Sequence, residues 1–593
     1  MSVLSEIVDA VERHEKFVDR QAERARTDLK FRDALLKRWN NVLQRVDTVT
    51  TPTGLRLPRV ALPQIDDPVE LARFLFAEAP PGEFPFVNGA YRELYLDRKK
   101  ADEPEQPGLE AALPEEPTRL FAGLGLAEDT NERFRYLTRQ QKSVRLSTAF
   151  DGPTLYGLDS DADGAFGKVG EGGVAIDTVD DMERLYRGFK LDDPHFSVSM
   201  TINAPSPIIL AMYVASAKRR LGPRVLAKLR GTTQADIFKE AQAQNEIIFP
   251  LQASLRFLTD TIAFTADHMP RWYPISISGY HIGEAGATPV QQAAFTLSNG
   301  FCYVELLHRR GLDVNRFGPR LSFFLDCGLD IEYAVLARVC RKLWAIGMRD
   351  VFKAGDRAQL FRLHTQTSGR SLIAMEFKNN ITRTAIELML AYISATNSCH
   401  SNSADEPFTT PAEEYVRLAA HAQAILLEET GLFKTMMNTF GGSPGMRTLE
   451  REVQKGILAE FREIDRIGGV IEAIEHRYQR SQIQEAAHRY ERQVNDGTRP
   501  IIGLNRYWNE KSDLPELKVV RTPRFKKHLQ IRRLREFKRR HAKHSERALD
   551  RLAAVVETGG SVFEELIRTV EHCSLGQITR RLQEVVGRYR PMI

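Results

Sequence analysis

The sequence contains no apolar run long enough to cross a membrane. A membrane-spanning helix needs about 18 or more consecutive apolar residues, and no segment of the 593-residue chain approaches that length. Residues 1–9 have neither the basic start nor the apolar core of a signal peptide. We therefore expect a soluble, cytoplasmic protein with no membrane partner.

Cysteine is scarce and dispersed. The five cysteines, at positions 302, 327, 340, 399 and 573, include no pair at the short spacing of a zinc or redox motif. Reduced thiols are therefore the expected state. The formal net charge of +5 is also small for a chain of this length, so whole-chain charge indicates no class of partner.

Several nucleotide and hydrolase motifs are missing as well. The chain has no Walker lysine motif, no His-Glu-x-x-His pair and no nucleophile elbow. The glycines of residues 167–173 precede a predicted strand instead of following one. They therefore do not match a dinucleotide-binding fingerprint, and we interpret them as a turn.

What is present indicates a large globular chain that begins with a helix. With 42% hydrophobic and 27% charged residues, the chain is long enough to form several domains. Apolar residues recur at helical spacing near the N-terminus, at Leu35, Trp39, Leu43 and Val46. This stripe predicts a long amphipathic helix. The helix either lies on its own domain or forms an arm that holds another subunit.

The stretch around which the chain is organised lies near its middle, at residues 272–287. Ile275 and Ile277 alternate with serines as in a buried strand, and Gly279 then breaks the run. Tyr280 and His281 are thereby placed at the C-terminal end of a strand, where the loops of a parallel barrel build the active site. We predict a functional pair; the alternative is a structural histidine whose hydrogen bonds are satisfied.

From residue 143 onward, short strand-like runs alternate with helix-length segments. The runs are residues 144–150, 174–178, 196–203, 227–233, 274–281, 321–327, 361–367 and 394–402. Eight strands that alternate with helices predict an α/β fold, a (β/α)8 TIM barrel. The predicted domains are an N-terminal helical arm (1–50), an N-terminal extension and connector (51–142), the barrel (143–430) and a C-terminal helical region (431–593).

Polar residues fall at or near the ends of the predicted strands. They are Asp151, Asn203, Thr232, Gln234, Tyr280, His281, Asp326, His364, Gln366, His400 and Asn402. Each one alone is compatible with a loop cap or a turn residue. Their joint position is the stronger signal, because the active face of a barrel lies at the C-terminal ends of its strands.

Beyond about residue 430 the pattern is mostly helical. We predict an amphipathic helix at 450–474, broken at Gly468-Gly469, and a charged helix at 483–495. Residues 518–547 form a basic run of the kind that can bind nucleic acid or an acidic partner. Apolar residues recur within it at near-helical spacing, at Leu529, Ile531, Leu534 and Phe537. The interpretation as the wet face of a helix is therefore favoured over nucleic-acid binding.

Specific segments carry a resemblance to a known family. They are Gly82-Glu-Phe-Pro-Phe86, Ser197-Val-Ser-Met-Thr-Ile-Asn203, Gly231-Thr-Thr-Gln-Ala-Asp236, Ser276-Ile-Ser-Gly-Tyr-His-Ile-Gly-Glu-Ala-Gly286, Phe317-Gly-Pro-Arg-Leu-Ser-Phe-Phe324, His364-Thr-Gln-Thr-Ser-Gly369 and Ile501-Ile-Gly-Leu-Asn505. Through them the chain resembles the adenosylcobalamin-dependent acyl-CoA mutases, the methylmalonyl-CoA and isobutyryl-CoA mutase family. Pro117-Thr-Arg-Leu-Phe-Ala-Gly123 and Ser147-Thr-Ala-Phe-Asp-Gly-Pro-Thr-Leu-Tyr-Gly157 extend the resemblance to the mutase part of the fused isobutyryl-CoA mutases.

The resemblance implies a radical rearrangement. In this family a cobalamin-derived 5′-deoxyadenosyl radical removes a substrate hydrogen, the thioester group migrates to the neighbouring carbon, and the product radical takes the hydrogen back. By the same resemblance, His281 would donate a hydrogen bond to the thioester carbonyl, and Tyr280 would wedge beside the adenosyl group. Glu284 and Glu406 match positions that contact the nucleoside side of the cofactor. The positions that match the acyl-CoA channel are Thr232, Gln234, Arg320, Ser322, His364 and Gln366.

Two positions bear most on the choice of substrate. Methylmalonyl-CoA mutases hold the free carboxylate of their substrate with a tyrosine and an arginine, and the matching positions here are Phe121 and Gln244. A buried carboxylate without a cationic partner is costly, so the resemblance favours an isobutyryl-type substrate. Hydroxyisobutyryl-CoA mutases place an aspartate at or near Phe150, and its absence counts against a hydroxylated substrate.

Two features depart from the family pattern. The Asp-x-His-x-x-Gly motif, whose histidine ligates cobalt, does not occur, and neither does the phosphate-binding loop of the fused proteins' G-domain. We therefore expect a separate small cobalamin-binding subunit to ligate the cobalt, with a G-protein chaperone as a further candidate partner. In addition, Pro407 follows Glu406 where alanine is usual, and Cys399-His-Ser401 replaces Leu-His-Thr, which bears on packing near the cofactor.

The sequence thus predicts the large, substrate-binding subunit of an acyl-CoA mutase. This isomerase would interconvert isobutyryl-CoA and n-butyryl-CoA. One alternative is the same chemistry on isovaleryl-CoA, pivalyl-CoA or 2-hydroxyisobutyryl-CoA. Another is a non-catalytic scaffold with a basic, nucleic-acid-binding helix near its C-terminus.

Overall fold

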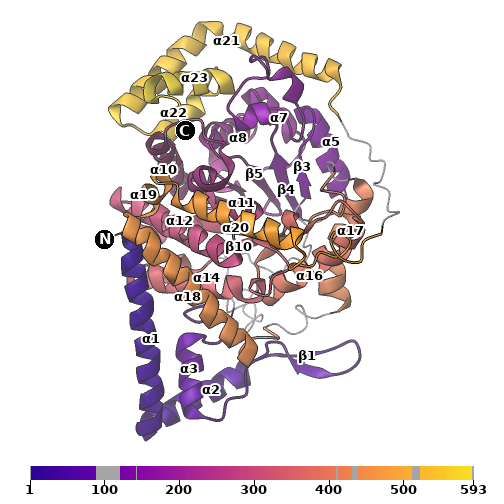
Figure 1. Cartoon of the computed structure of the whole chain (residues 1–593). Coiled ribbons are helices and arrows are strands. Elements are labelled where there is room, and N and C mark those ends of the chain that lie inside the picture. Colours follow the sequence, from indigo (N-terminus) through magenta and orange to yellow (C-terminus); the bar gives the residue numbers. More distant parts are fainter. Residues whose placement is uncertain are drawn as a thin grey trace. The chain divides into compact units, whose positions relative to one another are not determined.

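The computed structural model describes residues 2–88, 120–139, 141, 143–408, 412–430, 438–509 and 521–589 (Figure 1). The chain divides into two compact units, each built from two separate stretches. Unit 1 comprises Met1–Pro117 and Ser278–Lys518, and unit 2 comprises Thr118–Ile277 and Val519–Ile593. Residues 518–520, the start of the basic run, lie outside the described residues.

Unit 2 contains a parallel sheet with the strand order β3-β4-β5-β6-β7. The strands are β3 (Leu120–Ala122), β4 (Val144–Ala149), β5 (Phe196–Thr201), β6 (Gly231–Thr233) and β7 (Trp272–Tyr273). The helices between them are α5 (Ala127–Thr138), α6 (Gly152–Leu155), α7 (Val179–Leu185), α8 (Ser206–Leu221), α9 (Ile237–Lys239) and α10 (Leu251–His268). Sequential strands pair in parallel, which requires such crossover helices.

The core of unit 2 lies between this sheet and its helices. Phe196, Val198 and Met200 alternate along β5 as buried residues, and the residues between them are only partly buried. Every residue of α8 from Ser206 to Ala217 is buried. A helix that is apolar on all sides is expected to be covered on all sides, and α8 accordingly belongs to the large apolar cluster of this unit.

Three C-terminal helices complete the same core. They are α21 (Arg524–Thr558), α22 (Val562–Thr569) and α23 (Leu575–Val586). Phe537, Leu552 and Leu566 of these helices belong to the cluster that contains β4, β5 and α8, and α22 packs against α8 and α10 (Figure 1). The C-terminal helices and the first strands of unit 2 therefore share one apolar core.

The basic run lies on α21 and is largely engaged inside unit 2. Lys527 pairs with Glu171 at 2.7 Å, Arg533 with Glu128 at 2.6 Å, and Lys538 with Asp159 at 2.8 Å. The apolar side of the helix carries Leu534 and Phe537, both 1% exposed. The interpretation of these charges as one face of a packed helix is confirmed.

Unit 1 contains a second sheet, with the strand order β11-β10-β9-β8. The strands are β8 (Ile275–Ser278), which spans the boundary between the units, β9 (Leu321–Cys327), β10 (Leu363–Thr367) and β11 (Ser398–His400). The pairs β9–β10 and β10–β11 are parallel. The helices that follow the strands are α11 (Tyr280–Glu284), α12 (Pro289–Arg309), α13 (Val314–Phe317), α14 (Tyr333–Asp350), α15 (Asp356–Gln359), α16 (Asn379–Ile393) and α17 (Glu413–Ala424).

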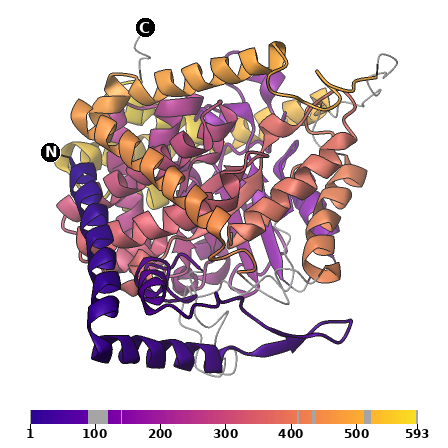
Figure 2. The ribbon, with the colours of Figure 1, turned by 60° about the horizontal axis from the view of Figure 1, so that its bottom comes forward.

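The N-terminal segment of unit 1 forms two helices where one was predicted. α1 (Val3–Thr27) ends at Asp28, whose side chain accepts a hydrogen bond from Phe31 N and so caps α2 (Leu29–Arg45). Figure 2 shows the chain turning there. On α2, Leu35 and Trp39 are buried as predicted, but Leu43 is exposed.

The buried stripe of α2 packs within unit 1. Its apolar partners include Leu71 and Phe74 of α3 (Pro68–Ala77), and α1 packs against α3, α14 and α18 (Pro444–Ile467). These helices therefore pack against other elements of unit 1. A short antiparallel hairpin, β1 (Thr48–Thr50) with β2 (Arg56–Pro58), follows α2 (Figure 2).

Most of the predicted strands are present, and the differences have local causes. Residues 174–178 form no strand beyond one bridge between Val174 and Phe150, although Val174 and Ile176 are fully buried. Side chains satisfy the backbone there: Ile176 N donates to Thr154 Oγ1, and Asp177 N donates to an Asp181 carboxylate oxygen. The sheet instead begins at β3, which the sequence reading missed.

The remaining strands and helices differ from prediction mainly in their ends. The run 227–233 is a strand only at β6, since a 3-10 helix (Pro223–Ala227) precedes it. The run 274–281 is a strand only over β8, because α11 starts at Tyr280. The break at Gly468 and Gly469 is confirmed: both have positive φ, and they separate α18 from α19 (Val470–Glu475). The charged helix α20 (Tyr478–Asn495) begins earlier than predicted.

The structure therefore shows a mixed α/β protein with parallel sheets. All five cysteines are buried and free, as expected from their spacing. Within the described ranges, no helix combines the length and the hydropathy that crossing a membrane requires.

We predict that Lys538→Met lowers the free energy of unfolding by about 2 kcal/mol. Asp159 is only 4% exposed, so losing Lys538 leaves a buried carboxylate without its cation. Urea denaturation followed by circular dichroism measures the change. Arg539→Met is the matched control, because Arg539 is exposed and pairs with no described acidic residue; it should change stability by less than about 0.5 kcal/mol. Equal effects in both variants would contradict the prediction.

Candidate functional site

One face of the sheet in unit 1 is polar and half-buried. Along β9 and β10, Ser322, Phe324, His364 and Gln366 alternate with fully buried apolar or threonine residues. His364 lies in register between Phe324 of β9 and Ser398 of β11. Because alternate residues of a strand point to one face, these side chains form a single surface.

Tyr280 and His281 follow β8, at the edge of this surface. Gly279 separates strand from helix, and its N–H donates to the Phe324 carbonyl at 2.7 Å. A Cβ at Gly279 would lie 2.2 Å from Thr296 Oγ1, so this close approach of the backbone requires glycine. The turn positions the first residues of α11 beside β9.

Aromatic contacts hold the pair in place. The Tyr280 ring stacks on Phe324 with centroids 4.7 Å apart and planes 10° apart. His281 meets the edges of both rings, at 5.4 Å from Tyr280 and 5.9 Å from Phe324. His281 Nδ1 lies 2.8 Å from the Ser278 hydroxyl. When Ser278 donates this hydrogen bond, the imidazole proton is on Nε2, which is then a hydrogen-bond donor.

The Tyr280 hydroxyl joins a chain of amides. Gln366 Nε2 donates to Tyr280 Oη at 3.0 Å and to Asn402 Oδ1 at 2.8 Å. Asn402 in turn donates to the Thr367 carbonyl at 2.7 Å. Burial, followed by the Glu284 and Glu406 carboxylates, raises the pKa of Tyr280 well above its ordinary value. The phenol therefore remains neutral.

Glu284 is fixed by the chain that follows β10. Its Oε1 accepts hydrogen bonds from Ser368 Oγ at 2.9 Å, Gly369 N at 2.8 Å and Arg370 N at 3.3 Å. Glu406 accepts a bond from Ser403 N at 3.3 Å. Desolvation, followed by the Glu284 charge, raises the pKa of Glu406. Glu406 remains exposed, so solvent limits this rise.

Asp326 lies behind this surface and is 1% exposed. It accepts hydrogen bonds from Gln292 Nε2 and from Tyr333 Oη. Burial raises its pKa to about 7, against the opposing charge of Arg370. Asp326 thus supports the site from behind and does not belong to its accessible surface.

The remaining site residues that the sequence predicts in unit 1 lie on or beside the same strands. Arg320 immediately precedes β9 and is half-buried, as is Ser322 on that strand. His364 Nδ1 lies 2.7 Å from Ser398 Oγ, which orients the ring. All the unit 1 residues predicted from the sequence therefore lie on or near the strands β8 to β11.

The predicted residues of unit 2 form a second group. In the parallel register, Phe121 of β3 lies beside Ser147, Ser147 beside Ser199, and Ser199 beside Thr232 of β6. Hydroxyl side chains thus run across one face of the sheet. Phe121 is 50% exposed, so its ring is accessible.

The ends of these strands contain two buried predicted residues. Phe150 follows β4 and is 3% exposed, and Gln234 follows β6 and is 7% exposed. Asn203 Nδ2 donates to Gln234 Oε1 at 3.1 Å, and Asn203 Oδ1 accepts from Asp236 N. Asn203 thereby fixes the orientation of the Gln234 amide.

Gln244 ends a short π-helix (Glu240–Gln244) and is exposed. Lys239 Nζ donates to Gln244 Oε1 and forms an ion pair with Glu240 at 2.5 Å. The side chains of Lys239 and Glu240 are both 0% exposed. With its oxygen engaged by Lys239, the Gln244 amide presents its N–H groups outward.

The sequence did not single out Phe324, and one predicted polar residue, Asp151, has a capping role. Phe324, which stacks on Tyr280, sits at an alternate position of β9 between Ser322 and Asp326, a period-two signal that could have found it. Asp151, predicted at a strand end, is 1% exposed and accepts bonds from Thr154 N and Gly170 N. It caps a turn and is not part of the accessible surface.

Comparison with known proteins identifies the family of this chain. Residues 64–588 match the family model described as methylmalonyl-CoA mutase. The chain belongs to the methylmalonyl-CoA mutase family. The fused isobutyryl-CoA mutases of Geobacillus kaustophilus and Cupriavidus metallidurans are 44% and 42% identical over 92% and 91% of this chain. The 2-hydroxyisobutanoyl-CoA mutase large subunit of Aquincola tertiaricarbonis is 36% identical over 86% of it.

The relatives differ in how much of their length the chain matches. It spans about half of the fused mutases, 51% of the Geobacillus kaustophilus protein and 50% of the Cupriavidus metallidurans protein. It spans 88% of the Aquincola tertiaricarbonis large subunit. The family members named here are mutases, a class of isomerase.

In unit 1, fixed carboxylate and amide groups offer hydrogen-bonding partners to a polar ligand. Glu284 is held by Ser368 and Gly369, and Tyr280 and Gln366 are joined by a hydrogen bond. Among the described residues, no cluster of three or more histidine, cysteine or acidic side chains is arranged to hold a metal ion.

We predict that Asp326→Asn flattens the pH dependence of stability. The folded protein binds a proton at Asp326 that the unfolded chain releases near the ordinary pKa of 3.8, so stability falls as pH rises from about 4 toward 7. Asparagine keeps the acceptor oxygen and removes the titration. Melting temperatures measured from pH 5 to pH 8 should therefore fall less in the variant, by a few degrees. Parallel pH profiles would show that Asp326 does not titrate in this range.

Proposed function

We propose that this chain is the large, substrate-binding subunit of an adenosylcobalamin-dependent acyl-CoA mutase that interconverts isobutyryl-CoA and n-butyryl-CoA. The observation that carries the proposal is the Tyr280–His281 pair, packed on Phe324 and joined to Gln366 at the end of β8. The relatives named as fused isobutyryl-CoA mutases support this substrate class. A (β/α)8 barrel that carries the site is part of the proposal, as the family resemblance implies.

In this proposal His281 acts on the thioester carbonyl. We take the Ser278 hydroxyl, 2.8 Å from Nδ1, as the donor of that hydrogen bond, which leaves Nε2–H to donate to the carbonyl oxygen. Negative charge can develop on that oxygen during migration. A fixed donor then stabilises the charged oxygen more than it stabilises the neutral carbonyl of the bound substrate. The stacked Phe324 ring limits the rotation of Tyr280 and His281, so the donor is oriented before the substrate binds.

Adenosylcobalamin, when bound, would supply the radical that exchanges a hydrogen with the substrate. Glu284 and Glu406 are the residues of this chain that would hold its nucleoside side. Glu284 is already oriented by Ser368 and Gly369, so binding needs no rearrangement of its carboxylate. The neutral Tyr280 hydroxyl and the Gln366 amide offer hydrogen bonds without placing a charge near a radical.

The residues proposed to contact an acyl-CoA are those that the family resemblance implies. In unit 2 these are Thr232 and Gln234, and in unit 1 they are Arg320, Ser322, His364 and Gln366. Small hydroxyl side chains leave space and offer weak hydrogen bonds, which suits an extended ligand with amide groups. The guanidinium of Arg320 can pair with a carbonyl or phosphate oxygen.

The selectivity argument rests on charge near Gln244. Lys239 donates a hydrogen bond to Gln244, but it forms a fully buried ion pair with Glu240, so its charge is already balanced. A free carboxylate on the substrate would then meet the neutral amide of Gln244 and the apolar ring of Phe121. Such a carboxylate would be desolvated without a counter-ion, whereas an isobutyryl group has none. Phe150, which is buried, offers no hydrogen bond to a hydroxylated acyl group.

A separate, small cobalamin-binding subunit is the partner in this proposal. The relative described as a large subunit, which this chain covers over 88% of its length, supports a split architecture. The cobalt ligand would then come from the small subunit. A G-protein chaperone is the further partner that the fused relatives suggest.

The direct test is turnover of isobutyryl-CoA by this chain with adenosylcobalamin, with and without a small cobalamin-binding subunit encoded nearby. We expect n-butyryl-CoA only when the small subunit is present. His281→Ala should lower kcat by about 10²- to 10³-fold, with acyl-CoA binding retained. His308→Ala, which changes an exposed histidine on α12, should leave kcat unchanged.

Two outcomes of this test would count against the proposal. Turnover of His281→Ala within a few-fold of wild type would refute the catalytic assignment. Absence of product in all combinations, together with tight binding of a different acyl-CoA, would assign the chain another substrate of the same family.

The selectivity argument has its own test. Gln244→Arg combined with Phe121→Tyr should strengthen methylmalonyl-CoA binding at least tenfold, because arginine supplies the missing counter-ion. Titration calorimetry measures both acyl-CoA affinities. Gln244→Glu is the matched control and should give no gain. If the double variant and the control bind methylmalonyl-CoA equally, charge at position 244 does not set the substrate.

A further inference from the structure

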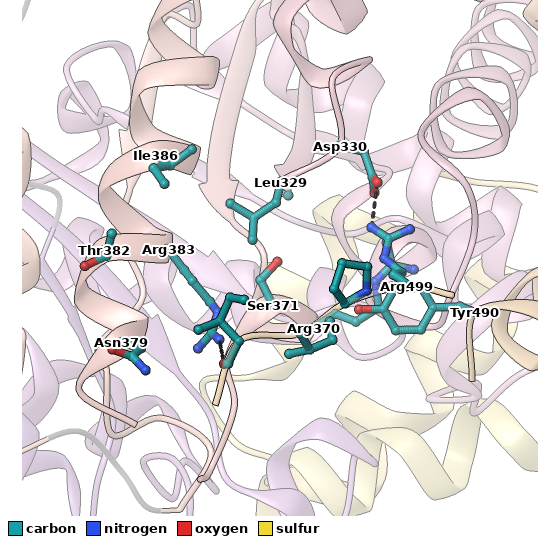
Figure 3. A pocket seen from close by; sticks show the side chains of 14 residues that line it. Leu329, Asp330, Arg370, Ser371, Asn379, Thr382, Arg383, Ile386, Tyr490 and Arg499 are labelled. Atoms are coloured by element: carbon teal, nitrogen blue, oxygen red, sulfur yellow. Dashed lines mark hydrogen bonds and ion pairs between the residues drawn. The ribbon is translucent and has the colours of Figure 1, made fainter. Parts of the chain in front are cut away.

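A cavity of about 370 Å³ opens in unit 1 beside the ends of β9 and β10 (Figure 3). Its walls come from the chain after β9, the chain after β10, helix α16, and the segment from Tyr490 to Ile502. None of the site residues predicted from the sequence lines it. The proposed mutase site therefore does not involve this cavity.

The cavity carries an excess of positive charge. Arg370, Arg383 and Arg499 line it, and among the described residues of its wall Asp330 is the single carboxylate. Asp330 is already paired with Arg499 at 2.5 Å, as the dashed line in Figure 3 shows. The guanidinium groups of Arg370 and Arg383 therefore have no carboxylate partner among the described residues of the cavity wall.

These two guanidinium groups contact neutral acceptors. Arg383 donates to Asn380 Oδ1 at 2.8 Å and to the Ile502 carbonyl at 2.5 Å, and Arg370 donates to the Ala287 carbonyl at 3.3 Å. Neither makes an ion pair with a residue that the structure describes. Desolvation lowers the pKa of Arg383, and the charges of Glu387 and Glu376 only partly oppose this effect.

Other charges near Arg370 are already engaged elsewhere. Asp326 and Glu284 stabilise its charge, but Asp326 accepts hydrogen bonds from Gln292 and Tyr333, and Glu284 accepts from the backbone after β10. These carboxylates do not line the cavity. The guanidinium of Arg370 can therefore accept an additional anionic partner there.

The rest of the wall combines apolar and aromatic side chains with the neutral polar side chains of Ser371, Asn379 and Thr382. Leu329, Ile386 and Ile502 are 41%, 43% and 47% exposed, although large apolar side chains are usually better covered. The Tyr490 ring lies 5.0 Å from the Arg370 guanidinium and 4.6 Å from that of Arg499. These cation–π contacts fix both guanidinium groups against the wall.

We propose that this cavity binds a small organic oxyanion, a carboxylate or a phosphate ester with a compact apolar body. Guanidinium groups match the geometry of both oxyanions, and the exposed Ile386 and Leu329 side chains would cover the apolar part. The volume is within the range of small-ligand sites. This inference does not depend on the proposed mutase activity, because it concerns different side chains and its test contains neither acyl-CoA nor cobalamin.

The test is calorimetric titration of the full chain with three probes at constant ionic strength: inorganic phosphate, phenyl phosphate and benzoate. We expect phenyl phosphate to bind at least fivefold more tightly than inorganic phosphate, because its ring is buried against the apolar wall. Arg383→Gln should weaken binding of all probes at least tenfold. Arg492→Gln, which removes an exposed arginine from the same helix as Tyr490, is the matched control and should bind as wild type.

A second variant separates a binding defect from a folding defect. Ile386→Ala keeps every charge, so it should still bind inorganic phosphate but lose the advantage of phenyl phosphate. Preference for phenyl phosphate would identify a phosphate-ester site, and preference for benzoate a carboxylate site. No binding of any probe to the wild type, or equal binding to Arg383→Gln and Arg492→Gln, would overturn the proposal.

Discussion

Both sheets depend on one constraint, which is that a parallel strand covered by helices must bury one face completely. On β5 that face is Phe196, Val198 and Met200, and on β9 it is Leu321, Phe323 and Leu325. The residues between them are then free to be polar. This alternation explains how a chain with extensive apolar cores can also present rows of hydroxyls, imidazoles and amides on its strands.

The fold could be predicted where this pattern is strong and local. The strand at 321–327 was found with both ends correct, because it is long and followed by turn residues. β3 has three residues, too few to show a period. Residues 174–178 are apolar enough for a strand, but Thr154 and Asp181 occupy the backbone N–H groups that a ladder would need. Such side-chain competition depends on tertiary contacts and leaves no periodic signal.

The sequence predicted where the candidate site lies along the chain, but it did not predict the contacts that hold its side chains. The end of β8 marked Tyr280 and His281 because a glycine interrupts a buried alternation there. The alternation along β9 places Phe324 on the same face as Ser322, but it does not show that the Phe324 ring stacks on Tyr280. Likewise, the sequence does not show that the Lys239 charge beside Gln244 is balanced by an ion pair with Glu240. The spacing of residues in the sequence predicts which side chains share a face of a strand or helix. Which charged side chains pair with one another can be seen only in the three-dimensional structure.

Unit 2 is built from two stretches that are far apart in the chain, so it cannot fold completely until the second stretch has been synthesised. Its sheet is synthesised first, but α21 to α23 emerge only after the roughly 240 residues of Ser278–Lys518. At about 5–20 residues per second, the ribosome needs on the order of 12–50 seconds for that interval. During it, the surface that Phe537, Leu552 and Leu566 later cover stays open to solvent. Unit 2 therefore cannot complete its core during synthesis of its first half.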